Sequence, residues 1–185
     1  MDTVKILKDG GVIVMPTDTI YGILGSAVNP KTVEKIYLLR KRSLDKPFII
    51  LIGSIKDLEV FGIQLSSKQR QFLEKNWPNP LSAVLSVKNG QWEYLHRGTK
   101  TLALRMPNDE KLLEVLKQTG PLVAPSANIE GEKPSQTLDQ AKKYFGDNVE
   151  FYIDNGTVNQ KPSTLIELKE DGSYKVLRQG EYKLV

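Results

Sequence analysis

Short, mainly apolar segments recur along the chain, and each is followed by proline, glycine or polar residues. They are three to seven residues long and occupy residues 12–15, 48–52, 81–87, 102–106 and 122–124. Segments of this length and content are typical of buried β-strands. The longest purely apolar run is residues 48–52, which is far short of the roughly 18–20 residues that a membrane-spanning helix needs. The sequence therefore predicts a globular fold built around a sheet.

Helical patterns alternate irregularly with these strands. Asn29 and Pro30 form a typical helix start, with Asn as the cap and Pro at the first helical position. Helices are predicted over residues 30–40, 66–74, 108–117 (with Asn108 as its cap) and 137–146. Further strands are predicted over residues 151–153, 164–168 and 174–178, the last two forming a hairpin. Because strict βαβ alternation is missing, we expect one α/β (α+β) domain over residues 1–185, with a twisted mixed sheet and flanking helices.

Cysteine is absent, and His96 is the only histidine. Disulfide scaffolds, thiolate metal sites and thiol nucleophiles are thereby excluded, as is any mechanism that needs two histidines. His96 stands between Leu95 and Arg97 and is expected to be a loop residue rather than a general base. The remaining composition, 39% hydrophobic and 26% charged, is ordinary for a globular protein.

The positive charge is concentrated in one short segment. Residues 31–46 contain six basic and two acidic residues, which accounts for the whole net charge of +4. A local cationic cluster on a near-neutral body favours a local anion such as a phosphate group. A protein that coats nucleic acid more often carries a wider excess. The alternative, a solvated helix end, fits these residues equally well.

Polar residues gather where the predicted strands end. Such groups occur at residues 17–19, 126–128 and 163–164, and Arg178 ends the last strand. Arg105 interrupts an apolar strand, where a charge is costly unless it is paired. Arg105 is therefore expected to form a buried ion pair or to contact a ligand. Neither a Walker A pattern nor GxGxxG occurs, so a nucleotide would be held by other means.

Taken in order, these groups resemble the motifs of the YrdC family, also called TsaC, the L-threonylcarbamoyladenylate synthases. The resemblance runs from about Gly11 to Gly180, and in length the chain resembles the short, single-domain members. Each motif is short, but the ordered set is specific. The motifs are Pro16-Thr17-Asp18-Thr19-Ile20-Tyr21-Gly22, Arg40-Lys41-Arg42, Leu104-Arg105-Met106-Pro107, Pro125-Ser126-Ala127-Asn128, Lys133-Pro134-Ser135, Ser163-Thr164 and Leu177-Arg178-Gln179-Gly180.

The resemblance implies a nucleotidyltransferase with a positively charged concave cleft. Its implied reaction converts L-threonine, bicarbonate (or CO2) and ATP into threonylcarbamoyl-AMP and pyrophosphate. A downstream threonylcarbamoyl transferase complex then modifies tRNA beside the anticodon. Mg2+ is implied as a cofactor held mainly through the ATP phosphates. Such a reaction needs positioned cations and no protein nucleophile, in agreement with the missing cysteines.

The resemblance also implies roles for individual residues. The residues implied for threonine are Thr19, Arg105, Ala124 and Ser163. Those implied for ATP are Arg42, Lys46, Thr101, Ser126, Asn128, Ser135 and Arg178. Arg40 and Arg42 are the implied catalytic cations, and no protein metal ligand is expected.

The chain departs from the family pattern at several positions. Arg40 stands where Lys is usual, Ser43 where Pro is usual, and Leu51 where longer relatives often carry His. The segment 130–133 is one residue longer than is typical, which loosens the placement of Ser135.

Two other functions remain open at the level of sequence. The first is a non-catalytic RNA-binding module in ribosome or tRNA maturation, which the pI of about 9.1 favours weakly. The second is a carbamoyltransferase that uses carbamoyl phosphate, since YrdC-like domains also occur in hydrogenase maturation proteins. The N-terminal residues lack a signal-peptide pattern, so a cytoplasmic location without membrane contact is expected. Direct contact with tRNA is left open.

Overall fold

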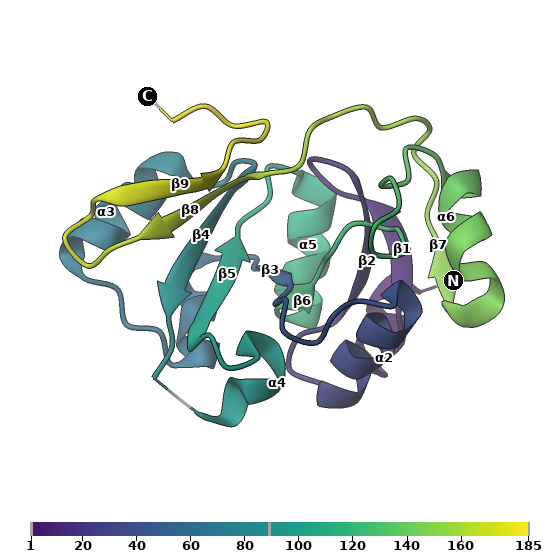
Figure 1. Ribbon diagram of the computed structural model, residues 1–185, viewed down its shortest axis with the longest axis horizontal. Helices are drawn as coiled ribbons and strands as arrows, with labels where there is room; N and C mark the ends of the chain where they lie inside the picture. Colours follow the sequence, from purple (N-terminus) through teal and green to yellow (C-terminus); the bar gives the residue numbers. More distant parts are fainter. Residues whose placement is uncertain (1, 89, 185) are drawn as a thin grey trace.

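One mixed β-sheet organises residues 2–88 and 90–184, the part of the chain that a computed structural model describes (Figure 1). In sheet order its nine strands are β7 (Phe151–Tyr152), β1 (Ile13–Pro16), β2 (Tyr21–Ser26), β6 (Leu122–Val123), β3 (Ile49–Leu51), β5 (Thr101–Arg105), β4 (Leu81–Ser86), β8 (Thr164–Leu168) and β9 (Tyr174–Arg178). The pairs β1–β7, β3–β5 and β4–β8 are parallel, and the other neighbouring pairs are antiparallel. The predicted α/β (α+β) fold with one mixed sheet is confirmed.

Helices flank this sheet. They are α1 (Thr3–Lys8), α2 (Pro30–Arg40), α3 (Ser67–Asn76), α4 (Glu93–His96), α5 (Glu110–Thr119) and α6 (Leu138–Phe145), with 3₁₀ turns at Ile55–Phe61, Gly90–Trp92 and Gly146–Asn148. Within the described ranges, no helix has the length and apolar content that crossing a bilayer requires.

Side-chain caps fix the starts of the longer helices. Asn29, Ser66 and Thr137 each accept hydrogen bonds from backbone N–H groups of the first helical turn, as predicted. The predicted cap Asn108 is wrong, because the cap of α5 is Asp109. The backbone N–H of Asn108 instead donates to a carboxylate of the candidate site described below.

Successive side chains of a strand point to opposite faces of the sheet, so the core consists of two clusters, one on each face. Val12 and Val14 belong to the larger core cluster, which also contains residues of α2, α3 and α6. Ile13 and Met15 lie in a smaller cluster with residues of α1 and α5. Since successive side chains of a strand point to opposite faces, a strand covered on both faces must be apolar throughout. This explains the uninterrupted apolar run at β3.

Strand β5 has one face in the core and the other on a cavity. Leu102 and Leu104 of β5 lie in the larger core cluster. Ala103 and Arg105, which alternate with them, face the opposite side and line a cavity. The open side of β5 and its neighbours therefore positions the candidate site.

Helix α1 and strand β2 were not among the predicted elements. Gly25 lies in this strand because α2 packs closely, and a Cβ at Gly25 would collide with Cγ2 of Thr32. The prediction of a loop position for His96 is also wrong, since His96 ends α4 and is buried.

A long segment joins β7 to β8 across the sheet (Figure 1). The hydroxyl of Tyr21 in β2 anchors its first part by donating to the carbonyl of Gly156 at 2.8 Å. The same hydroxyl accepts a hydrogen bond from the N–H of Asn155 at 3.1 Å. The segment is thus tied to the strand that follows residues 17–19 and then delivers Ser163 to the cavity.

Candidate functional site

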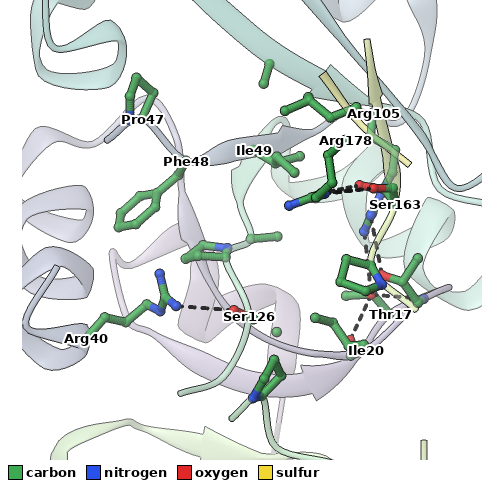
Figure 2. Close-up of a pocket in the computed structure, with 18 of the residues that line it drawn as sticks. Thr17, Ile20, Arg40, Pro47, Phe48, Ile49, Arg105, Ser126, Ser163 and Arg178 are labelled. Atoms are coloured by element: carbon green, nitrogen blue, oxygen red, sulfur yellow. Dashed lines mark hydrogen bonds between the residues drawn. The ribbon is translucent and has the colours of Figure 1, made fainter. Parts of the chain in front are cut away.

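A cavity of about 360 Å³ lies where strand ends and loops bring the predicted polar groups together (Figure 2). Its lining residues are Thr17, Thr19, Ile20, Gly22, Arg40, Arg42, Pro47, Phe48, Ile49, Ala103, Arg105, Ala124, Pro125, Ser126, Pro134, Pro162, Ser163, Leu165 and Arg178. They come from segments separated by more than 150 positions in the chain, so only the tertiary fold assembles this site.

Most of the predicted site residues meet in this cavity. Those that line it are Thr19, Arg40, Arg42, Arg105, Ala124, Ser126, Ser163 and Arg178. Lys46, Thr101, Asn128 and Ser135 do not line it. The roles assigned to all of these residues stay predictions, and the geometry below shows what each side chain contacts.

Arg105 forms a buried ion pair with Asp18. Its Nη2 lies 3.2 Å from Oδ1 of Asp18, and both side chains are almost fully buried. The hydroxyls of Thr19 and Thr17 lie 3.4 and 3.5 Å from the guanidinium. Of the two expected explanations for Arg105, the structure shows the ion pair and also places Arg105 in the cavity wall.

The Asp18 carboxylate also contacts the turn that follows β5. Its Oδ2 accepts a hydrogen bond from the backbone N–H of Asn108 at 3.0 Å, which ties residues 17–19 to the turn between β5 and α5. Burial lowers the pKa of Arg105, and the charge of Asp18 partly opposes this shift. Within the described chain, Nε of Arg105 has no hydrogen-bond acceptor. A buried donor without an acceptor is available to a ligand carboxylate.

Arg40 holds the loop that follows β6. Its Nη2 donates to Oγ of Ser126 and to Oδ1 of Asn128, both at 3.2 Å, and its Nε donates to the carbonyl of Asn128 at 3.0 Å. The Asn128 amide donates in turn to the carbonyls of Ile129 and Glu132. Burial lowers the pKa of Arg40 to about 10, so the side chain is still charged at neutral pH. This geometry makes Arg40 a positioning residue for Ser126.

Arg178 and Ser163 form a second polar group, supplied by β9 and the segment before β8. Nη2 of Arg178 donates to the carbonyl of Ser163 at 2.9 Å. The hydroxyl of Ser163 shares a hydrogen bond of 2.9 Å with the hydroxyl of Ser82. Gly180 allows the backbone after β9 to lie close to the backbone that precedes Ser163, because a Cβ at this position would collide with the carbonyl oxygen of Pro162. Close backbone contact thus explains the glycine of the last motif.

Arg42 and Lys46 lie in the segment between α2 and β3. Nε of Arg42 donates to the carbonyl of Lys46 at 3.0 Å, and its guanidinium lies 5.5 Å from the ring centre of Phe48. The Lys46 ammonium lies outside the cavity lining and bonds to Glu130 at 2.8 Å.

Thr101 and Ser135 lie apart from the cavity. Thr101 is at the opposite end of β5 from Arg105, roughly 13 Å away at the usual rise of a strand, and its hydroxyl donates to that of Thr99. The Ser135 hydroxyl is buried and donates to the carbonyl of Ala127. In this structure Ser135 therefore stabilises the loop that carries Ser126, and Thr101 belongs to a different part of the same strand.

The cavity is cationic. Four arginines line it, and among the described residues no carboxylate does so. Burial lowers the pKa of Arg178 as it does that of Arg105, but guanidinium groups start from so high a pKa that they stay charged. Such a site suits anionic ligands, with planar donors for carboxylates and phosphates.

No cluster of three or more His, Asp or Glu side chains that could hold a metal ion occurs in residues 2–88 and 90–184. The donor set of the cavity is cationic and hydroxylic, so it fits phosphate oxygens rather than a metal ion. These residues fit Mg2+ only as an ion that arrives with ATP.

Two carboxylates near the site were not among the predicted site residues. Asp18 stands inside the first motif, where its charge between two threonines is a usable signal. Glu130 lies in a polar loop and carries no signal in the sequence, because its partners Arg42 and Lys46 are more than 80 positions away.

Comparisons with known proteins agree with this geometry. The profile of the Sua5/YciO/YrdC family, described as "Telomere recombination", matches residues 5–180. The chain belongs to this family, and the predicted family membership is confirmed.

Relatives in this family are named threonylcarbamoyl-AMP synthase. One, from Pyrococcus abyssi, is 34% identical over 89% of this chain and 49% of its own length. Another, from Photobacterium profundum, is 28% identical over 96% of both chains.

Solved structures share the fold. The P. abyssi Sua5 structure in complex with L-threonine aligns with a TM-score of 0.87 at 30% identity, covering 96% of this chain and 52% of that one. This chain therefore spans about half of that protein. E. coli YciO aligns with a TM-score of 0.82 over 96% of this chain and 86% of that one, at 24% identity.

Proposed function

We propose that this chain is an L-threonylcarbamoyladenylate synthase, which converts L-threonine, bicarbonate (or CO2) and ATP into threonylcarbamoyl-AMP and pyrophosphate. The observation that carries the proposal is one cavity in which Arg42, Arg105 and Arg178 meet hydroxyl groups and which no described carboxylate lines. The names of the relatives, and the threonine complex of P. abyssi Sua5, support this function over a non-catalytic RNA-binding module.

The chemistry needs positioning and neutralisation of charge. The threonine amine attacks the carbon of CO2 and loses a proton, which gives a carbamate. A carbamate oxygen then attacks the α-phosphorus of ATP while the bond to pyrophosphate breaks. Neither step forms a bond to the protein, in agreement with a cavity lined by arginines, hydroxyls and apolar groups.

The cavity divides between the two substrates in this proposal. Arg105 binds the threonine carboxylate, and Thr19, Ala124 and Ser163 complete the amino-acid side. Arg42, Ser126 and Arg178 face the ATP phosphates, with Lys46 at the rim. Arg40 and Asn128 act through the loop that they hold.

Mg2+ bound to the ATP phosphates would add charge neutralisation at the leaving group. We further propose a cytoplasmic enzyme whose product passes to a threonylcarbamoyl transferase complex that acts on tRNA.

The test is pyrophosphate release by the purified protein with Mg2+. We expect release only when L-threonine, bicarbonate and ATP are all present, and loss when any one is omitted. A relative that is active under the same conditions serves as the control. Absence of pyrophosphate would reject the proposal, and turnover of carbamoyl phosphate without threonine would favour a carbamoyltransferase.

A further inference from the structure

Glu130 is an acidic residue placed against the two cations that flank the cavity rim. Its Oε1 accepts a hydrogen bond from the Lys46 ammonium at 2.8 Å and lies 3.9 Å from Nη1 of Arg42. Its Oε2 accepts a hydrogen bond from the backbone N–H of Ser43 at 2.7 Å. The pair of cations and the N–H together form the kind of donor set that binds a phosphate group.

The position of Glu130 is fixed from the other side as well. Its backbone N–H donates to the carbonyl of Arg40, the last residue of α2, at 2.8 Å. Hydrogen bonding by Lys46 and by the N–H of Ser43 lowers the pKa of Glu130, so the carboxylate is charged at neutral pH. In the described chain, Glu130 is the carboxylate that forms ion pairs with Arg42 and Lys46.

We propose that Glu130 is an internal competitor of nucleotide phosphates for Arg42 and Lys46, and that it thereby sets the affinity of the site for polyphosphates. A phosphate that binds these cations must either displace the Glu130 carboxylate or lie next to it. In the second case the two negative groups repel each other. The inference rests on the proposed use of ATP, because it assumes that Arg42, which lines the cavity, contacts the ATP phosphates.

The substitution Glu130→Gln removes the charge and keeps the shape and an acceptor for the N–H of Ser43. We expect it to tighten ATP binding by about three- to tenfold at low ionic strength, measured by calorimetry. The gain should increase from AMP to ADP to ATP, because the added charges are phosphates. It should also shrink as salt is added, since the pair is partly exposed.

Asp45→Asn is the matched control. Asp45 lies on the same segment as Arg42 and Lys46 and carries the same charge as Glu130, but its described side-chain contact is with the Ser43 hydroxyl rather than with a cation. We expect it to change ATP affinity by less than about twofold, with the small residual effect due to screened repulsion. Glu130→Ala provides a second variant, in which the gain should persist if charge is the cause.

Weaker or unchanged ATP binding in Glu130→Gln would overturn the inference, because Glu130 would then organise the cations instead of competing with phosphates. An equal gain for AMP, ADP and ATP would overturn it as well. If the unsubstituted protein binds ATP normally while Glu130→Gln gives either result, the proposed function stands and only this inference fails. Absence of ATP binding in both proteins would count against both.

Discussion

Removal of the Arg105 side chain should affect stability and substrate binding through separate causes. In Arg105→Ala the Asp18 carboxylate, which is almost fully buried in the unsubstituted protein, loses its ion-pair partner at 3.2 Å. Breaking a buried pair on one side costs about 3–5 kcal/mol in the free energy of unfolding. If Arg105 also binds the threonine carboxylate, the loss of that charged contact lowers affinity by about 1.5–3 kcal/mol, or about 10- to 150-fold in Kd.

A double variant separates these two effects. In Asp18→Asn/Arg105→Ala no unpaired charge is buried, and the Asn side chain still accepts a hydrogen bond from the N–H of Asn108. We therefore expect most of the lost stability to return while threonine affinity stays low. Denaturant unfolding measures the first quantity, and calorimetric titration with L-threonine measures the second.

The reasoning would be refuted by normal threonine binding in the folded double variant, since Arg105 would then serve only the ion pair. It would also be refuted if the double variant were as unstable as Arg105→Ala. ATP affinity, which the proposed function assigns to other arginines, should stay within about threefold of the unsubstituted value in the double variant.

Three further predictions concern residues around the site. Gly180→Ala should lower stability by about 1–3 kcal/mol and weaken threonine binding, because its Cβ would collide with the backbone that positions Ser163. Thermal melting measures the loss of stability. Gly90→Ala is the control, because a Cβ at Gly90 meets nothing within 4 Å. Asn29→Ala should lower the free energy of unfolding by about 1 kcal/mol through loss of the α2 cap, with substrate affinities retained. Glu150→Gln should destabilise the protein at pH 7 by about 1 kcal/mol, discounted for exposure, and less as pH falls through the carboxylate's folded pKa. Burial raises the pKa of Glu150, but its hydrogen bonds and its ion pair with Lys35 lower it by more, so the folded pKa lies below the unfolded value. The contribution of Glu150 to stability is therefore present above the unfolded pKa and is lost in acid. Equal destabilisation by Glu150→Gln at pH 7 and in acid would contradict this.

Local chemistry in the sequence predicted much of the fold. Apolar runs and capping residues act over a few positions, so β3 and the start of α2 were predicted within one residue. Strand β2 could not be predicted this way, because its glycine content matches a loop. Gly25 is required there by the approach of Thr32 from α2, which is a tertiary contact.

In the candidate site, too, the identities of the residues were predictable from the sequence, whereas their tertiary contacts were not. The resemblance to the YrdC family implied which side chains belong to one site, and eight of the predicted residues line one cavity. The sequence did not show that Asp18 is the partner of Arg105, or that Arg40 donates its hydrogen bonds to the Ser126 loop. Those pairings depend on distances between segments some 86 or 87 positions apart, which residue type alone does not encode.

The most direct test of the central claim is the mass of the nucleotide product formed from L-threonine, bicarbonate and ATP. We predict threonylcarbamoyl-AMP, with a mass that increases when ¹³C-bicarbonate replaces bicarbonate and again when labelled threonine is supplied. Formation of ADP and phosphate, or of an adenylate that contains threonine without the bicarbonate carbon, would contradict the proposed reaction.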